Sequence, residues 1–153
     1  MAYLHLFAQH GVARSRMAPL DIFHVETGGC TACALELRML ARGLVATCGN
    51  VRFVSTPRQA ALLLLTGSLT VEMAPVVELA WQAMPGPRAL AAVGDCAVDG
   101  GVFPPNYATL GGVGTYARTS LSLAGCPPAP EEILAALLNW HGRDDAGPAP
   151  PGQ

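Results

Sequence analysis

Apolar and polar residues along the chain follow two periodicities that alternate with each other. Short runs that alternate or are fully apolar predict strands, and longer runs with apolar residues three or four apart predict helices. The predicted strands are residues 20–25, 51–54, 61–66, 89–93 and 120–123, and the predicted helices are residues 33–45, 73–84 and 131–141. This alternation predicts an α/β fold built on a mostly parallel sheet.

The strand predicted at residues 61–66 is unbroken aliphatic, which is typical of a central parallel strand covered on both faces. Residues 97–118 are rich in glycine and are predicted to form one long loop. A length of 153 residues favours a single domain, which we place at residues 19–141. Residues 1–18 are expected to form an N-terminal arm, and the Pro/Gly-rich residues 142–153 a disordered tail.

The composition indicates a chain that needs partners. Hydrophobic residues make up 51% and charged residues only 13% of the chain, so we expect much of its surface to be covered by another protein. The net charge is −2 and no Lys/Arg group stands out, which argues against a nucleic-acid partner. No apolar run reaches about 18 residues, and no secretory signal is visible, so the chain is expected to have no transmembrane helix.

Four of the five cysteines lie in turns rich in glycine or proline: Cys30, Cys33, Cys96 and Cys126. They form one C-x-x-C pair, followed after 62 and then 29 intervening residues by the two single cysteines. All three turns directly follow predicted strands. Ligands of open α/β sheets bind beyond the carboxyl ends of strands, so the four sulfurs are predicted to meet at one edge of the sheet.

Four thiolates from separate loops are the usual ligands of one iron–sulfur cluster. Zinc also accepts four thiolates, and the spacing alone leaves that alternative open. A C-x-x-C after a strand is in other proteins a redox pair, but that interpretation gives Cys96 and Cys126 no function. Cys48 lies outside the pattern and is predicted to be an ordinary thiol rather than a ligand.

Five short blocks, in this order, carry a resemblance to a known family: Gly29-Cys30-x-x-Cys33-x-x-Glu36, Thr66-Gly67-x-x-Thr70, Gly94-x-Cys96-Ala97-x-x-Gly100-Gly101, Gly111-Gly112-Val113 and Gly125-Cys126-Pro127-Pro128-x-Pro130. From about His24 to Trp140 the chain resembles the small, electron-transfer subunit of membrane-bound (group 4) [NiFe] hydrogenases. That subunit is related to the 20 kDa iron–sulfur subunit of respiratory complex I.

The resemblance implies a flavodoxin-like domain with helices on both faces of the sheet. It implies one [4Fe-4S] cluster held by Cys30, Cys33, Cys96 and Cys126, close to a catalytic large subunit on another chain. The expected role is to pass electrons between that large subunit and a further iron–sulfur protein or ferredoxin. Membrane subunits of the complex would hold the chain at the cytoplasmic side of the cell membrane, as a peripheral subunit.

The first block separates the two related groups. Complex I subunits have two adjacent cysteines there, whereas this chain has Ala32 before Cys33, which resembles the hydrogenase form. The chain departs from the family at Thr31-Ala32, Ala34 and Val71-Glu72. The alternative is a subunit of a hydrogenase-related or complex I-type, quinone-reducing complex without nickel.

By resemblance Glu36 lies near the large subunit and joins a proton path or a polar contact. A favourable interaction of its carboxylate with the helix dipole is an equal alternative.

Overall fold

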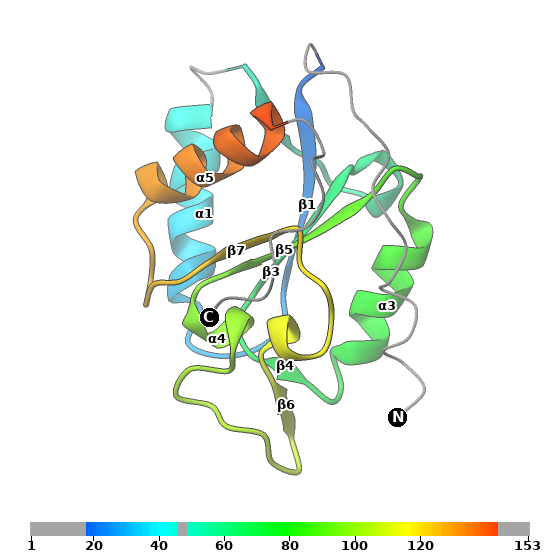
Figure 1. The fold of residues 1–153 in the computed structure, drawn as a ribbon, viewed down its shortest axis with the longest axis vertical. Coiled ribbons are helices and arrows are strands. Elements are labelled where there is room, and N and C mark those ends of the chain that lie inside the picture. The colour runs from blue at the N-terminus through cyan, green and yellow to red at the C-terminus, as the bar shows by residue number, and fades with distance from the viewer. Residues whose placement is uncertain (1–17, 46–48, 144–153) are drawn as a thin grey trace.

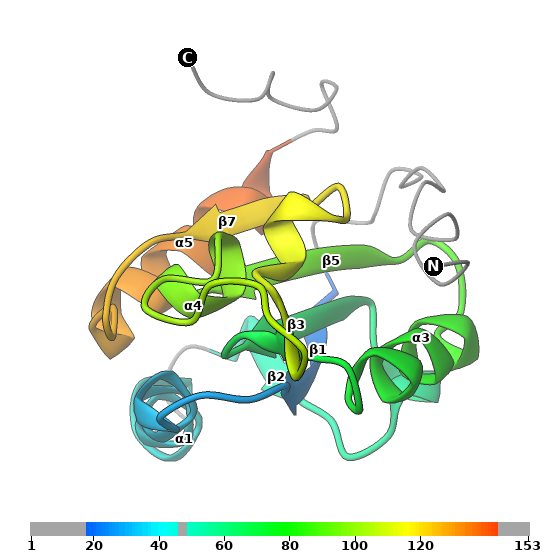
Figure 2. The ribbon, with the colours of Figure 1, turned by 90° about the horizontal axis from the view of Figure 1, so that it is seen from below.

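The computed structural model describes residues 18–45 and 49–143. Its centre is a five-stranded parallel sheet in the order β2-β1-β3-β5-β7 (Figures 1 and 2). The strands are β1 (Leu20–Glu26), β2 (Val51–Phe53), β3 (Leu62–Thr66), β5 (Ala89–Val93) and β7 (Leu121–Leu123). Counted along the chain, the spatial order of these five strands is 2-1-3-4-5, which is the flavodoxin-like order. The parallel α/β fold predicted from the sequence is confirmed.

The aliphatic strand β3 lies in the middle of the sheet, as its pattern predicts. It pairs with β1 from Ile22↔Leu62 to Glu26↔Thr66, and with β5 from Leu62↔Ala89 to Thr66↔Val93. Every residue of β3 is buried. A strand with neighbours on both edges and helices on both faces has no side that meets water, so all its positions are apolar or hydrogen-bonded.

Helices cover both faces of the sheet (Figures 1 and 2). Helices α1 (Ala32–Arg42) and α5 (Pro130–Gly142) contact each other and pack on one face, with Leu62 and Leu64 of β3 beneath them. Helix α3 (Ala74–Ala83) packs on the other face, against Leu63 and Leu65. Alternate side chains of a strand point to opposite faces, so β3 contributes to both cores.

The glycine-rich segment at residues 97–118 is more ordered than the sequence pattern predicts, and the prediction of one long loop is wrong. It contains the end of α4 (Asp95–Val98), the strand β6 (Thr109–Gly111) and a 3-10 turn, η3 (Val113–Thr115). Strand β6 pairs antiparallel with β4 (Leu69–Thr70). The other 3-10 turn, η2 (Pro57–Gln59), precedes β3. Elements this short contain too few residues to show a periodicity.

The predicted arm and tail lie almost wholly outside the described residues, as does Cys48. Among the described residues, α5 extends to Gly142, one residue past the predicted domain end. Among residues 18–45 and 49–143, no helix has both the length and the apolar character required to cross a lipid bilayer.

Candidate metal centre

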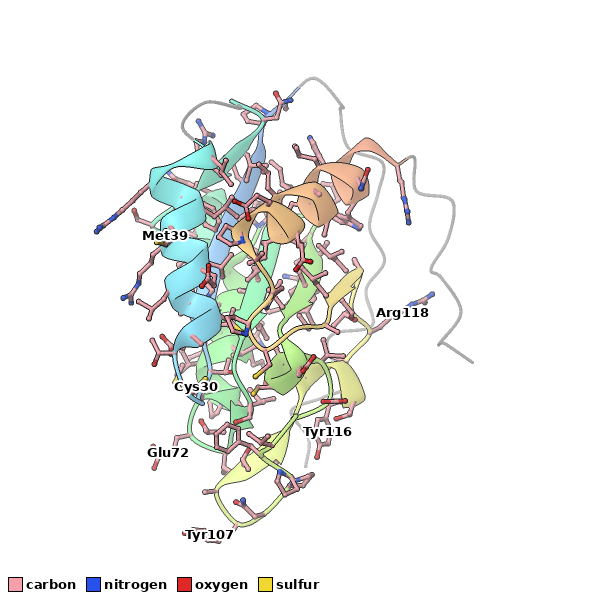
Figure 3. All side chains as sticks on the ribbon, turned by 90° about the vertical axis from the view of Figure 1, so that its left-hand side faces the viewer. Cys30, Met39, Glu72, Tyr107, Tyr116 and Arg118 are labelled. Atoms are coloured by element: carbon pink, nitrogen blue, oxygen red, sulfur yellow. The ribbon has the colours of Figure 1, made fainter. Side chains whose placement is uncertain are left out.

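The four cysteines predicted as ligands come from three loops at the carboxyl edge of the sheet. Cys30 lies in the loop after β1, and Cys33 lies in the first turn of α1. Cys96 lies in α4, directly after β5, and Cys126 follows β7. We call Cys30, Cys33, Cys96 and Cys126 the four-cysteine site. Figure 3 shows Cys30 at the lower end of α1, on the same side as the loops that follow β5 and β7.

Glycine shapes the loop that leads to Cys30. Gly28 and Gly29 have φ values of 150° and 103°, a region that L side chains rarely adopt. A Cβ on Gly28 would lie 2.8 Å from Cγ2 of Thr70 and 2.9 Å from the carbonyl oxygen of Ser68. The first cysteine loop is therefore packed, backbone against backbone, on the loop that follows β3.

Hydroxyl groups hold these two loops together. Thr27 is buried, and its Oγ1 lies 3.0 to 3.1 Å from the carbonyl oxygens of Thr66, Gly67 and Ser68. In return, Oγ1 of Thr70 donates to the carbonyl oxygen of Thr27 over 3.1 Å. In the sequence Thr66 and Thr70 belong to one of the five blocks, whereas Thr27 belongs to none of them. A threonine directly after a strand is too common to have revealed this role.

Gly94 brings the remaining loops against α1. A Cβ at Gly94 would lie only 2.5 Å from Sγ of Cys33 and 3.6 Å from the carbonyl oxygen of Gly125. Its N–H donates to the carbonyl oxygen of Leu123 over 2.8 Å, which joins the loop of Cys96 to that of Cys126. The absence of a side chain at Gly94 thus allows three loops to approach one another at the four-cysteine site.

Burial differs across the site. Cys96 is 8% exposed and Cys33 is half-buried, whereas Cys30 and Cys126 are exposed. Burial raises the pKa of Cys33 to about 11, helped by the charges of Cys96, Cys30 and Cys126. Burial also raises the pKa of Cys96, with smaller contributions from Cys126, Cys30 and Asp95.

Cys33 therefore lies within electrostatic reach of the other three cysteines, and Cys96 within reach of Cys30 and Cys126. Four thiolates so placed repel one another unless cations lie between them, and metal binding couples to their deprotonation. The donor set therefore fits an iron–sulfur cluster, which requires four thiolates. Among the described residues, no three His, Cys, Asp or Glu side chains are spaced to bind one single metal ion.

A small cavity adjoins three of the cysteines and is also lined by Glu26, Thr66 and Gly67. Glu36, the predicted proton-path residue, lies half-buried one turn beyond Cys33 on α1 and is not among the residues that line this cavity. Its role therefore stays a prediction. Glu26 belongs to none of the five sequence blocks, but it is the last residue of β1 and lies at the same edge of the sheet.

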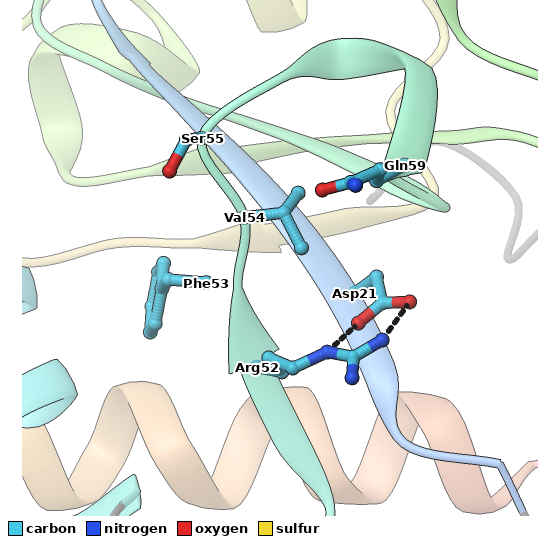
Figure 4. A pocket seen from close by; sticks show the side chains of 6 residues that line it. All are labelled: Asp21, Arg52, Phe53, Val54, Ser55 and Gln59. Carbon is cyan, nitrogen blue, oxygen red and sulfur yellow. Dashed lines mark hydrogen bonds and ion pairs between the residues drawn. The ribbon is translucent and has the colours of Figure 1, made fainter.

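A much larger open hollow, of about 510 Å³, lies elsewhere, beside the edge strand β2 (Figure 4). Asp21, in the first half of β1, and Arg52 of β2 form a two-point ion pair in it, with distances of 2.6 and 2.9 Å. Hydrogen bonding to Asp21 raises the pKa of Arg52. The guanidinium is thus engaged by a neighbour within the fold, and none of the four cysteines lines this hollow.

His24 lies on β1, and its ring contacts the last residue of β3. Its Nε2 is 2.8 Å from Oγ1 of Thr66, so it is a hydrogen-bonded structural histidine. Burial lowers the pKa of His24 below its ordinary value of 6.5, while Glu26 raises it and Arg38 lowers it by smaller amounts.

This shift gives a prediction about stability. Below about pH 6.5 the unfolded chain protonates His24 more readily than the folded chain, so the free energy of unfolding falls as the pH falls. We expect His24→Gln, which retains a hydrogen-bonding group, to make that fall shallower between about pH 7 and 5. Urea unfolding of the purified chain at several pH values measures it. If the free energy of unfolding falls with pH equally steeply in the wild type and in His24→Gln, the prediction is contradicted.

A known protein family matches the part of the chain that contains the four-cysteine site. A profile of the family "NADH ubiquinone oxidoreductase, 20 Kd subunit" matches residues 30–140, which include all four cysteines of the site. The chain belongs to this family. The family predicted from the five sequence blocks is therefore confirmed.

Curated relatives in the family are subunits of quinone oxidoreductases. The B subunit of the NADH-quinone oxidoreductase of Saccharopolyspora erythraea is 41% identical over 117 residues, covering 75% of this chain and 53% of the relative. The corresponding protein of Clostridium beijerinckii is 37% identical over 114 residues, covering 73% of this chain and 68% of the relative. The chain thus spans about half the length of the first of these relatives.

Solved structures with the same fold include hydrogenases. A chain of an archaeal membrane-bound sulfane sulfur reductase superposes with a TM-score of 0.66 at 25% identity, covering 82% of this chain and 72% of that one. A chain of an NAD⁺-reducing [NiFe]-hydrogenase superposes with a TM-score of 0.60 at 22% identity, covering 88% and 98%. At 22% identity, the similarity to the hydrogenase chain shows only that the two chains share a fold.

Proposed function

We propose that this chain is the electron-relay component of a membrane-associated oxidoreductase complex and binds one [4Fe-4S] cluster through Cys30, Cys33, Cys96 and Cys126. The observation that carries the proposal is the convergence of these four cysteines at the carboxyl edge of the sheet: Cys30, Cys33 and Cys96 line one cavity, and Cys126 lies within electrostatic reach of Cys33 and Cys96. Such a cluster, when bound, accepts and donates single electrons. The rest of the chain positions the thiols and limits their access to water.

The distribution of burial supports a relay between two partners. Cys96 lies inside the fold, whereas Cys30 and Cys126 are exposed, so a partner chain is needed to exclude water from that side of the site. The exposed apolar side chains Val102 and Tyr107, in the loop after α4, offer such a partner apolar surface; they are 78% and 97% exposed. We propose that a hydrogenase-type large subunit covers this side. A further iron–sulfur protein or ferredoxin would exchange electrons with it, on the cytoplasmic side of the membrane.

The spacing Cys30-x-x-Cys33 favours a [NiFe] hydrogenase as the complex. The second candidate is a quinone-reducing or hydrogenase-related complex without nickel, and two observations favour it. The curated relatives belong to NADH-quinone oxidoreductases, and one of the solved structures with this fold belongs to a sulfane sulfur reductase.

Anaerobic purification of the whole complex tests these alternatives. Iron, nickel and zinc are measured together with the EPR spectrum of the reduced sample. About four irons for each copy of this chain, after subtraction of other clusters, together with nickel, support the hydrogenase relay. Iron without nickel supports the second candidate. Zinc in place of iron, with no EPR signal from a cluster, contradicts the relay altogether.

A further inference from the structure

Asp95 forms two hydrogen bonds with one residue of the neighbouring loop. Its backbone N–H donates to the carbonyl oxygen of Gly125 over 2.9 Å, and the N–H of Gly125 donates to Oδ1 of Asp95 over 2.7 Å. Each of these residues directly precedes a cysteine of the four-cysteine site, Cys96 or Cys126. One aspartate therefore satisfies both polar backbone groups of the residue that leads into Cys126.

Gly125 needs such support because its backbone conformation and surroundings are unusual. Its φ is 143°, and a Cβ there would lie 2.7 to 2.9 Å from three atoms of Pro128. The N–H of Gly125 is partly buried, and leaving such a donor without an acceptor costs free energy. A carboxylate is a stronger acceptor than a neutral group, so Asp95 is well suited to hold this turn.

We propose that Asp95 is a positioning residue of the four-cysteine site, and that its negative charge also lowers the reduction potential of the cluster held there. The second role rests on the proposed function, whereas the first concerns the protein alone. Asp95 is half-buried and adjacent to Cys96, so solvent screens its charge incompletely. A negative charge beside the site opposes the addition of an electron and so favours the oxidised form.

Two substitutions separate the two roles. In Asp95→Asn the amide oxygen still accepts from the N–H of Gly125, but the charge is lost. In Asp95→Ala both the acceptor and the charge are lost. Asp99→Asn is the matched control: it removes the same charge at the other end of α4, but Asp99 is exposed and its Oδ1 accepts from Gly101 rather than Gly125.

The first role is measured by amide hydrogen exchange of the purified full-length chain, which needs no cluster. We expect the N–H of Gly125 to exchange about tenfold faster in Asp95→Ala, because its acceptor is lost, and at the wild-type rate in Asp95→Asn and Asp99→Asn. An Ala variant that exchanges Gly125 as slowly as the wild type overturns the positioning role.

The second role is measured by a redox titration of the complex, followed by EPR. We expect Asp95→Asn to retain its iron and to shift the reduction equilibrium about tenfold towards the reduced form, about 59 mV for one electron. Asp99→Asn is expected to shift it less. An unchanged potential in Asp95→Asn, or loss of its cluster, overturns this role. A wild-type complex without any cluster refutes the proposed function, and the exchange measurement still decides the positioning role.

Discussion

Replacement of Cys96 by serine is expected to remove the cluster from this chain and to reduce electron transfer through the complex by about 100-fold or more. Cys96 is the most buried of the four cysteines, and it lies in the short helix α4 between β5 and the Gly100-Gly101 turn. A serine hydroxyl has almost the same shape but does not ionise near neutral pH. The fold is therefore expected to persist, while one of the four proposed ligands is lost.

Iron content and EPR of the reduced complex measure this effect, and circular dichroism of the purified chain checks that it is folded. Cys48→Ser is the control, since the sequence pattern predicts that Cys48 is not a ligand. The control is expected to keep its full iron content. A Cys96→Ser complex with wild-type iron content and an unaltered spectrum would show that Cys96 is no ligand and would contradict the proposed site.

The sheet was predictable because its strands carry strong local patterns. Leu62 to Leu65 are consecutive leucines, and a strand covered on both faces buries such a run completely. Strands β4 and β6, in contrast, have two and three residues. Their pairing depends on where the loops after β3 and α4 meet in space, which a pattern of neighbouring residues does not contain.

The cysteine loops were predictable from a single topological rule. Since parallel strands end at the same edge of a sheet, a cysteine after β1 and cysteines after β5 and β7 meet without any long-range information. The strand order explains the spacing, because β3 lies between β1 and β5 and contributes Thr66 and Gly67 rather than a cysteine. Long intervals between the cysteines thus correspond to whole β-α units of the fold.

The contacts that hold these loops were not predictable. The hydroxyl of Thr27 and the carboxylate of Asp95 each bind backbone groups about 30 to 41 residues away. Threonine and aspartate after strands are common in turns of every kind, so neither residue type identifies its partner. Glycine is equally ambiguous in a sequence, since it serves a turn at one position and a close approach at another.

Gly94 is the position where close approach matters most, and Gly94→Ala is expected to destabilise the chain by about 3 kcal/mol. The φ of Gly94 is 91°, which strains any other residue, and the added Cβ would lie 2.5 Å from Sγ of Cys33. Cys33 and the loop of Cys96 must then move apart. We therefore also expect the complex to lose most of the iron bound to this chain. Urea unfolding of the purified chain and iron analysis of the complex measure the two effects.

Gly86→Ala provides the matched control. Gly86 lies in the turn between α3 and β5, it is exposed, and a Cβ there would meet nothing within 4 Å. Because Gly86 has no positive φ in the left-handed region, alanine is expected to change the free energy of unfolding by no more than about 0.5 kcal/mol and to leave the iron content unaltered. If Gly94→Ala behaves like this control, the three loops are not as closely packed at Cys33 as the structure indicates. A loss confined to Gly94→Ala shows that the four-cysteine site requires the two features that Gly86 lacks, the positive φ of Gly94 and its close approach to Cys33.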